Sequence, residues 1–131
     1  MFSTLSVLIV DDDEFARGIL RHHLTRLGFK FISEAIDGEQ ALDTLRVTKM
    51  DLVIADRYMP RINGIELFCS IKKEIGIVEA PFIMITVEDS EDKIQDALKI
   101  GIRHYLVKPF NAQIFDNKVQ EALLQSELEF K

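Results

Sequence analysis

The chain has 131 residues, 47% of them hydrophobic, and a formal net charge of −6, which indicates one domain of ordinary size with a sizeable core. Its uninterrupted apolar runs are at most four residues long, far shorter than the ~20 needed to span a bilayer, and its acidic balance disfavours a basic nucleic-acid-binding face. We therefore expect a single domain over residues 1–131, stand-alone or followed by a further domain, that contacts neither a membrane nor nucleic acid directly.

Short β-branched runs recur along the chain and predict strands that alternate with helices. The runs begin near five positions: Ser6, Phe31, Leu52, Phe82 and Arg103. The third and fourth runs are almost wholly apolar, as expected for strands that are covered on both faces of a parallel sheet.

Between these runs, apolar residues recur at helical spacing and predict five amphipathic helices. The five stripes are Phe15, Ile19, Leu20, Leu24 and Leu27; Ala41, Leu42 and Leu45; Leu67, Phe68, Ile71 and Ile75; Ile94, Ala97 and Leu98; and Phe115, Val119, Ala122 and Leu123. Turn and capping signals separate them at Asp37-Gly38, at Asp89 with Asp92, at Gly101 and at Asn111.

Five β/α units in one domain predict an α/β fold with a doubly wound parallel sheet and five helices. Right-handed crossovers leave few possible topologies. The flavodoxin-like strand order 2-1-3-4-5 fits best, because it makes the first and third strands neighbours at the switch point where ligands bind.

Four of the predicted strands end in residues suited to phosphoryl chemistry. The first ends at Asp11-Asp12-Asp13, the third at Asp56, the fourth at Thr86 and the fifth at Lys108-Pro109. Alone, each has an ordinary explanation, such as a helix cap for the aspartates or a solvent-exposed lysine. Together they are expected to meet in one crevice, because the carboxyl ends of parallel strands lie at the same edge of the sheet.

The acidic side chains in this crevice predict a cation. Two like charges about 4 Å apart repel by about 4 kcal/mol at an effective dielectric of 20, so clustered carboxylates raise one another's pKa or recruit a metal. Carboxylates with carbonyls and water suit Mg²⁺. Asp56 closes an apolar strand, where an isolated carboxylate is costly, and is a candidate nucleophile towards phosphorus. Asp13 is expected to cap the following helix.

In these residues the chain resembles the receiver domains of two-component response regulators, and in size the single-domain chemotaxis type. The resemblance covers roughly residues 5–124. The motifs that carry it are Val10-Asp11-Asp12, Asp56 with Met59-Pro60 and Gly64, Thr86, and Tyr105 with Lys108-Pro109-Phe110. It implies a phosphorylation-dependent signalling switch whose output is binding. It also implies that the chain is not an enzyme beyond its own phosphorylation and dephosphorylation.

The resemblance implies a role for each acidic residue. Asp56 would be the phosphoacceptor. Mg²⁺ would be bound directly by Asp12, by Asp56 and by the backbone carbonyl of Tyr58, with Asp11 acting through a bound water.

The remaining strand-end residues would sense the phosphoryl group. Lys108 would pair with Asp56 or its phosphoryl group, and the Lys108-Pro109 bond would be cis. Thr86 would swing in to hydrogen-bond the phosphoryl oxygen, and Tyr105 would follow from a solvent-facing to an inward rotamer. The surface of the fourth helix, fifth strand and fifth helix would then change its affinity for a target.

The resemblance also implies partners and a compartment. The phosphoryl donor would be a histidine kinase or a phosphotransfer protein, and the output a downstream target protein. A cytoplasmic location is expected, because the residues before the first strand lack a basic signal-peptide region and the one cysteine, Cys69, fits a reducing compartment. We expect Cys69 to be a small buried hydrophobe.

The chain departs from the family pattern beside these positions. The residue after the switch threonine is usually small but here is Val87, which we expect to narrow access to the phosphoacceptor and slow phosphotransfer from small donors. Tyr58 and Glu88 are expected to set the lifetime of the acyl phosphate. Arg103-His104 replaces the acids typical of dimerising DNA-binding regulators, so their dimer is not expected.

Three alternatives remain open from the sequence. The run Asp11-Asp12-Asp13 contains the Asp-x-Asp start of haloacid-dehalogenase-like phosphatases, but these have a larger core and an acidic pair after their lysine. An FMN-binding flavodoxin-like module would offer Ser, Thr and Gly amides to the phosphate, which an acidic loop repels. A receiver-like scaffold that has lost phosphorylation is disfavoured by the complete set of acids, threonine and lysine.

Overall fold

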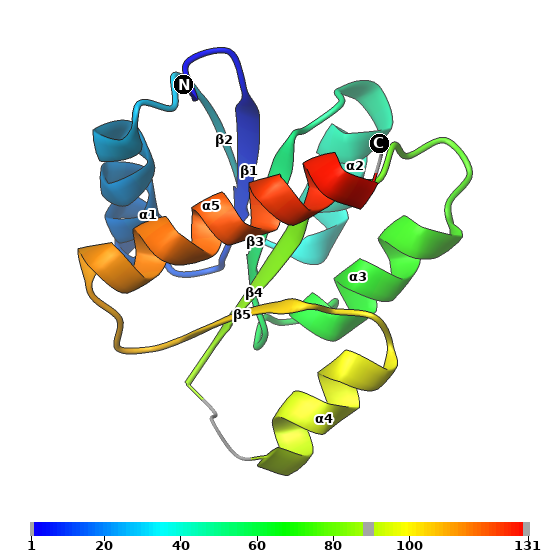
Figure 1. The fold of residues 1–131 in the computed structure, drawn as a ribbon. Helices are drawn as coiled ribbons and strands as arrows, with labels where there is room; N and C mark the ends of the chain where they lie inside the picture. The colour runs from blue at the N-terminus through cyan, green and yellow to red at the C-terminus, as the bar shows by residue number, and fades with distance from the viewer. Residues whose placement is uncertain (1, 88–90, 130–131) are drawn as a thin grey trace.

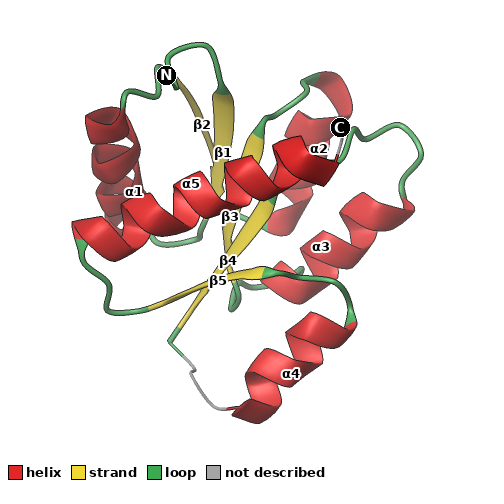
Figure 2. Cartoon of the chain, viewed as in Figure 1, coloured by secondary structure: helices red, strands yellow, loops and turns green. Residues whose placement is uncertain are grey.

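The computed structural model describes residues 2–87 and 91–129, in which five parallel strands alternate with five helices (Figures 1 and 2). The strands are β1 (Ser6–Val10), β2 (Phe31–Ala35), β3 (Leu52–Asp56), β4 (Phe82–Thr86) and β5 (His104–Val107). The helices are α1 (Glu14–Leu27), α2 (Gly38–Val47), α3 (Gly64–Lys73), α4 (Glu91–Lys99) and α5 (Ala112–Glu129). The sheet order is β2-β1-β3-β4-β5. The predicted flavodoxin-like α/β fold is therefore confirmed, with β5 beginning one residue later than expected.

The helices cover the sheet in two layers, with α1 and α5 on one face and α2, α3 and α4 on the other (Figure 1). Successive strand residues point to opposite faces, so Ile9 packs with α1 and α5 whereas Leu8 packs with α2 and α3. The five residues of β4 are all buried, as expected for a strand covered on both sides.

The predicted stripe of α1 is only partly buried. Leu20 and Leu24 lie in the core, but Phe15 is 76% exposed and Ile19 is also exposed. The expectation that Phe15 and Ile19 face the core is wrong because they line a surface cavity between α1 and the β5–α5 loop instead.

The predicted stripes of α3 and α4 also differ from the structure near their ends. Ile75 was expected on the third helix, but α3 ends at Lys73 and Ile75 is fully exposed. Glu74 accepts two hydrogen bonds from Arg46, and after this turn Ile77 enters the core in place of Ile75. On α4, Leu98 is likewise exposed.

Most of the predicted caps are present. Side-chain oxygens of Asp13, Asp37 and Asn111 accept hydrogen bonds from main-chain amides in the first turns of α1, α2 and α5. Gly101 has φ 105° in the turn after α4, where a residue with a side chain would be strained. The predicted helix start at Asp89 lies outside the described residues.

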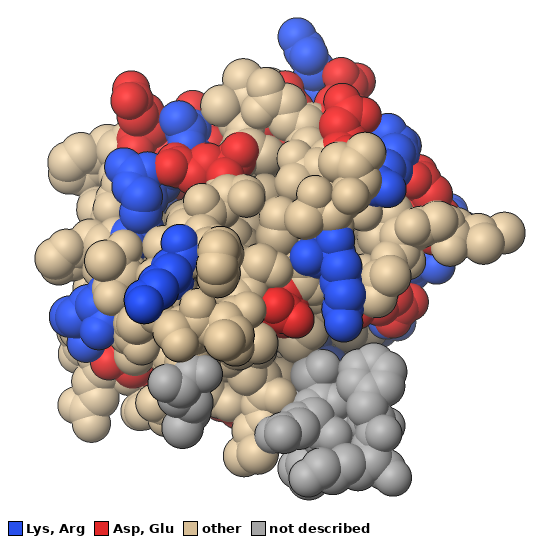
Figure 3. Space-filling model, turned by 90° about the horizontal axis from the view of Figure 1, so that it is seen from above, with Lys and Arg blue, Asp and Glu red and all other residues tan. Residues whose placement is uncertain are grey.

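The surface carries charges of both signs, which are interspersed over the face seen in Figure 3. Among the described residues, none of the helices combines the length and apolar character needed to cross a bilayer. Cys69 is a free thiol on α3 and is half-buried, so the expectation of a buried cysteine is wrong.

Candidate functional site

The strand order brings the predicted residues to one edge of the sheet. Val10 of β1 lies opposite Ala55 of β3, so the next residues, Asp11 and Asp56, leave the sheet side by side. The ladder continues past the strand ends, because Asp11 N donates to Ala35 O at 3.1 Å and Lys108 N donates to Thr86 O at 2.8 Å. These main-chain bonds fix the points from which the functional side chains project.

Three carboxylates form a cluster at this edge. One oxygen from each of Asp11, Asp12 and Asp56 lies within 4.8 Å of the others. Asp11 is only 2% exposed, and its buried Oδ2 has no hydrogen-bond partner among the described residues. An all-oxygen donor set with an unsatisfied buried carboxylate oxygen fits a hard divalent cation. The cluster is therefore consistent with the predicted metal site.

The negative charge of the carboxylate cluster is only partly balanced by the ammonium group of Lys108. Its Nζ lies 3.6 Å from Asp56 Oδ1 and 3.8 Å from Asp11 Oδ2. Burial, followed by the charge of Asp11, raises the pKa of Asp56 to about 6 despite the opposing effect of Lys108. Burial also raises the pKa of Asp11. A bound cation would relieve this excess of negative charge.

The β3–α3 loop folds tightly against the end of β3. A Cβ on Gly64 would lie 2.5 Å from Asp56 O, so only glycine allows this close approach. Arg57, which the sequence interpretation missed, is 7% exposed and donates from Nη1 to Lys93 O of α4 at 3.2 Å. Its guanidinium also lies 5.7 Å from the ring centroid of Tyr58. The one available signal was a cation directly after the candidate phosphoacceptor.

The two predicted switch residues lie on the β4–β5 side of the site. Thr86 is buried at the end of β4. Tyr105 is half-buried on β5, and its hydroxyl donates to Ile94 O of α4 at 3.1 Å. Burial raises the pKa of this phenol. Tyr105 is thus directed inward against α4, so the solvent-facing rotamer expected before phosphorylation is not the one in this structure.

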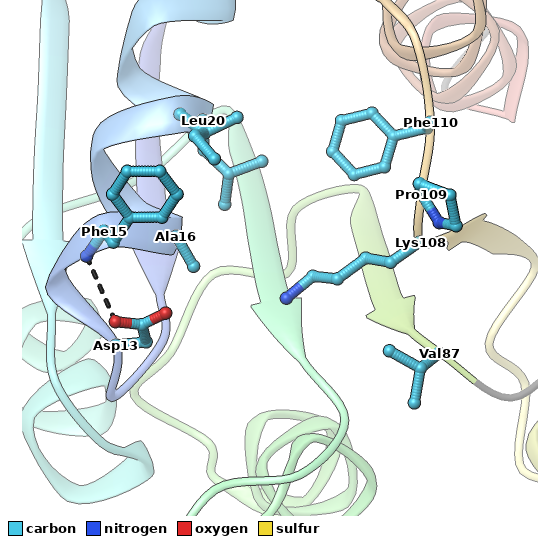
Figure 4. Close-up of a pocket in the computed structure, with 9 residues that line it drawn as sticks. Asp13, Phe15, Ala16, Leu20, Val87, Lys108, Pro109 and Phe110 are labelled. Atoms are coloured by element: carbon cyan, nitrogen blue, oxygen red, sulfur yellow. Dashed lines mark hydrogen bonds between the residues drawn. The ribbon is translucent and has the colours of Figure 1, made fainter.

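A cavity of about 490 Å³ opens beside the carboxylate cluster, between α1 and the β5–α5 loop. In Figure 4, Phe15 lies on its α1 side and Val87 on its β4 side, and the side chain of Lys108 extends towards α1 between them. Val87 is 65% exposed. The Lys108-Pro109 peptide bond is cis, as predicted. Val87 therefore borders the cavity that Lys108 also lines.

The roles predicted for the individual site residues stay predictions. The backbone carbonyl of Tyr58 as a metal ligand is untested, and Glu88 lies outside the described residues. A second residue that the sequence interpretation missed is Arg17, whose Nη1 donates to the main-chain oxygen of Asp11 at 2.7 Å.

Comparisons with known proteins agree on one family. The family model of the response regulator receiver domain matches residues 7–120. A chemotaxis protein CheY homolog of Campylobacter jejuni is 36% identical over 120 residues, covering 91% of this chain and 92% of that protein. Pseudomonas aeruginosa chemotaxis protein CheY is 35% identical over 117 residues, covering 89% and 94% respectively.

Solved structures agree as well. Vibrio cholerae chemotaxis protein CheY4 superposes with a TM-score of 0.83 at 31% identity, covering 91% of this chain and 98% of that one. These matches favour the receiver interpretation over the phosphatase and flavodoxin-like alternatives. With the acidic cluster at the predicted edge of the sheet, they show that the chain belongs to the response regulator receiver domain family, the phosphorylation-dependent switches of two-component signalling.

Proposed function

We propose that this receiver domain is switched by phosphorylation of Asp56. The observation that carries the proposal is the position of Asp56 at the end of β3, in a carboxylate cluster and 3.6 Å from the Lys108 ammonium. Membership of the family implies a histidine kinase as partner. We infer that the kinase or an intermediate phosphotransfer protein delivers the phosphoryl group, and that a downstream target reads the result.

The residues present fit Mg²⁺ as the metal. Asp11, Asp12 and Asp56, with the backbone carbonyl of Tyr58, would hold it, and the orphaned Oδ2 of Asp11 supports this assignment. When bound, Mg²⁺ supplies positive charge that neutralises the carboxylates and the phosphoryl oxygens. Asp12, the exposed member of the cluster, is accessible to a hydrated ion.

Asp56 and Lys108 then have separate roles in phosphotransfer. A carboxylate oxygen of Asp56 attacks phosphorus while the P–N bond of a donor phosphohistidine breaks, and the bonding electrons leave with the imidazole, which takes up a proton. Lys108, already beside Asp56 Oδ1, stabilises the charge gained at the acyl phosphate. The product carries additional charge and acceptor oxygens at the strand edge.

The phosphoryl group is then reported through Thr86 and Tyr105. We infer that the Thr86 hydroxyl hydrogen-bonds the phosphoryl oxygen and that this stabilises the inward position that Tyr105 already occupies here, changing the surface of α4, β5 and α5. Inverting a 1:99 ratio of active to inactive conformers takes about 5.5 kcal/mol. One hydrogen bond to a charged group gives at most about 3 kcal/mol. Several contacts, or a target that binds the active state, must therefore act together.

Residues at the rim tune the rate. Val87 borders the cavity beside Lys108, which supports the hypothesis that its branched side chain restricts small phosphodonors. We also propose that Tyr58 and Glu88 set the lifetime of the acyl phosphate. Substituting Tyr58 or Glu88 and timing dephosphorylation tests this, and unchanged lifetimes would refute it.

The proposal is tested by incubating the protein with Mg²⁺ and acetyl phosphate, or with a phosphorylated kinase, and measuring intact mass. The wild type should gain one phosphoryl group and Asp56→Asn none. Asp13→Asn is the matched control, because Asp13 accepts the helix-capping bond from Phe15 N and asparagine also caps helices. A wild type that no donor modifies, or an Asp56→Asn variant modified equally, would refute the proposal.

A further inference from the structure

Arg17 connects the acidic loop to the neighbouring strand. Its side chain is only 12% exposed. Nη1 donates to the main-chain oxygen of Asp11 at 2.7 Å, and Nε donates to Glu34 Oε1 of β2 at 3.0 Å. The second carboxylate oxygen of Glu34 accepts from Arg21, one turn further along α1. One guanidinium thus joins the β1–α1 loop to an anchored carboxylate on the sheet.

This contact completes the fixation of Asp11. Its amide donates to Ala35 O at 3.1 Å, and its Oδ1 accepts from Asp13 N at 2.9 Å. Its main-chain oxygen accepts from Arg17. The remaining polar atom is Oδ2, which is buried, finds no hydrogen-bond partner in the described part of the chain and lies in the carboxylate cluster, 3.8 Å from Lys108 Nζ. Three contacts within the chain therefore leave one oxygen of Asp11 for a cation.

The same contact orients the residue that follows. The main-chain oxygen of Asp11 and the amide of Asp12 belong to one planar peptide unit, so fixing the first restricts the second. Asp12 itself is exposed. Clustered carboxylates repel one another and would separate if their backbone were free. A donor that holds this peptide keeps both side chains at the spacing a metal needs.

We propose that Arg17 is a positioning residue. It holds Asp11 and Asp12 in place before Mg²⁺ binds and so raises the affinity of the domain for Mg²⁺. The proposal rests on the proposed function, since it takes the carboxylate cluster to be a Mg²⁺ site. Arg17 acts through the main-chain oxygen of Asp11 and through Glu34, so its planar fork, and not its charge alone, carries the role.

The experiment measures the Mg²⁺ dissociation constant from amide NMR shifts for the wild type, Arg17→Lys, Arg17→Ala and Arg21→Ala. Arg21→Ala is the matched control, because Arg21 lies on the same helix, carries the same charge and also pairs with Glu34. Both Arg17 variants should bind Mg²⁺ roughly tenfold more weakly, as is usual for residues that orient metal ligands. Arg21→Ala should stay within about twofold of the wild type, because the residue that orients the ligand is intact.

The remaining outcomes separate the explanations. Tighter binding by Arg17→Ala with unchanged binding by Arg17→Lys would show a pure charge effect and overturn the proposal. An equal change in Arg17→Ala and Arg21→Ala, or none in either Arg17 variant, would also overturn it. Arg17→Lys keeps the charge and the aliphatic stem, so the test remains decisive if Arg17→Ala does not fold. A wild type that binds no Mg²⁺ would instead refute the proposed function on which this inference rests.

Discussion

The two sides of the crevice are held by different means. On the β1–β3 side, main-chain and side-chain bonds fix Asp11 from three directions, with Arg17 bracing it from α1. On the β4–β5 side, α4 buries little apolar surface among its described side chains, chiefly that of Ala97. Its first turn accepts hydrogen bonds at two consecutive carbonyl oxygens, one from Arg57 of the β3–α3 loop and one from Tyr105 of β5.

This difference indicates that the two sides serve different functions, one holding the site in place and the other reporting its state. Phosphotransfer would require groups held in place, and the bonds to Asp11 hold the β1 part of the carboxylate cluster. A reporting element must change position at modest cost, so it is expected among the less firmly held parts of a fold. The lightly attached α4 meets this requirement.

The β1–β3 side, where clustered carboxylates repel one another, should become more stable when the charge of Asp56 is removed. The pKa of Asp56 is raised to about 6 from 3.8, so between these values the folded chain keeps a proton that the unfolded chain has lost. Ionisation above pH 6 therefore costs the fold on the order of 2–3 kcal/mol. Without Mg²⁺, Asp56→Asn should raise the free energy of unfolding by about this amount near neutral pH.

Urea denaturation at two pH values checks this prediction. The advantage of Asp56→Asn should shrink as the pH falls through 6 and vanish near pH 4, where the folded wild type carries a protonated Asp56. Added Mg²⁺ should also reduce the difference, because it stabilises the wild type more. If the wild type and Asp56→Asn were equally stable at both pH values, the charge of Asp56 would not destabilise the fold.

On the other side, Arg57→Met should loosen α4. Methionine keeps much of the apolar stem but loses the bond to Lys93 O, and hydrogen bonds to charged groups contribute about 1.5–3 kcal/mol. Because burying the guanidinium itself has a cost, we expect a net loss of about 1.5 kcal/mol in unfolding free energy. Hydrogen exchange should become faster in α4. Arg46→Met, which removes an exposed arginine on α2, should leave exchange in α4 unchanged.

Tyr105→Phe tests the second attachment of α4. It removes only the hydroxyl that donates to Ile94 O and keeps the ring, so a loss of about 1 kcal/mol is expected. Exchange of the α4 amides should quicken less than in Arg57→Met. If neither substitution alters α4, these two donors do not hold the helix.

Val87→Ala should have the smallest effect. Shortening this exposed side chain widens the route beside Lys108, so phosphorylation by acetyl phosphate should be a few-fold faster, equivalent to less than about 1 kcal/mol in the barrier. Rates from a time course of intact-mass spectra check this. The same rate in both proteins would show that Val87 does not restrict access.

The sequence predicted the parts of the molecule that depend on periodicity and strand ends. Strand order follows from the alternation of elements, and the convergence of Asp11, Asp56 and Lys108 follows from that order. Phe15 was misplaced because helical periodicity cannot tell whether an apolar side chain packs in the core or lines a surface cavity. Contacts such as that of Arg57 with α4 were not predictable, because they join side chains to main-chain atoms distant in sequence.

The most direct test of the contrast is an amide NMR shift map of the protein with Mg²⁺ before and after adding beryllofluoride, a phosphoryl mimic. We predict changes that extend from Asp56 through α4 and β5, and their loss in Asp56→Asn. Changes confined to the residues that touch the mimic, with α4 and β5 unaffected, would contradict the assignment of the β4–β5 side as the reporter of phosphorylation.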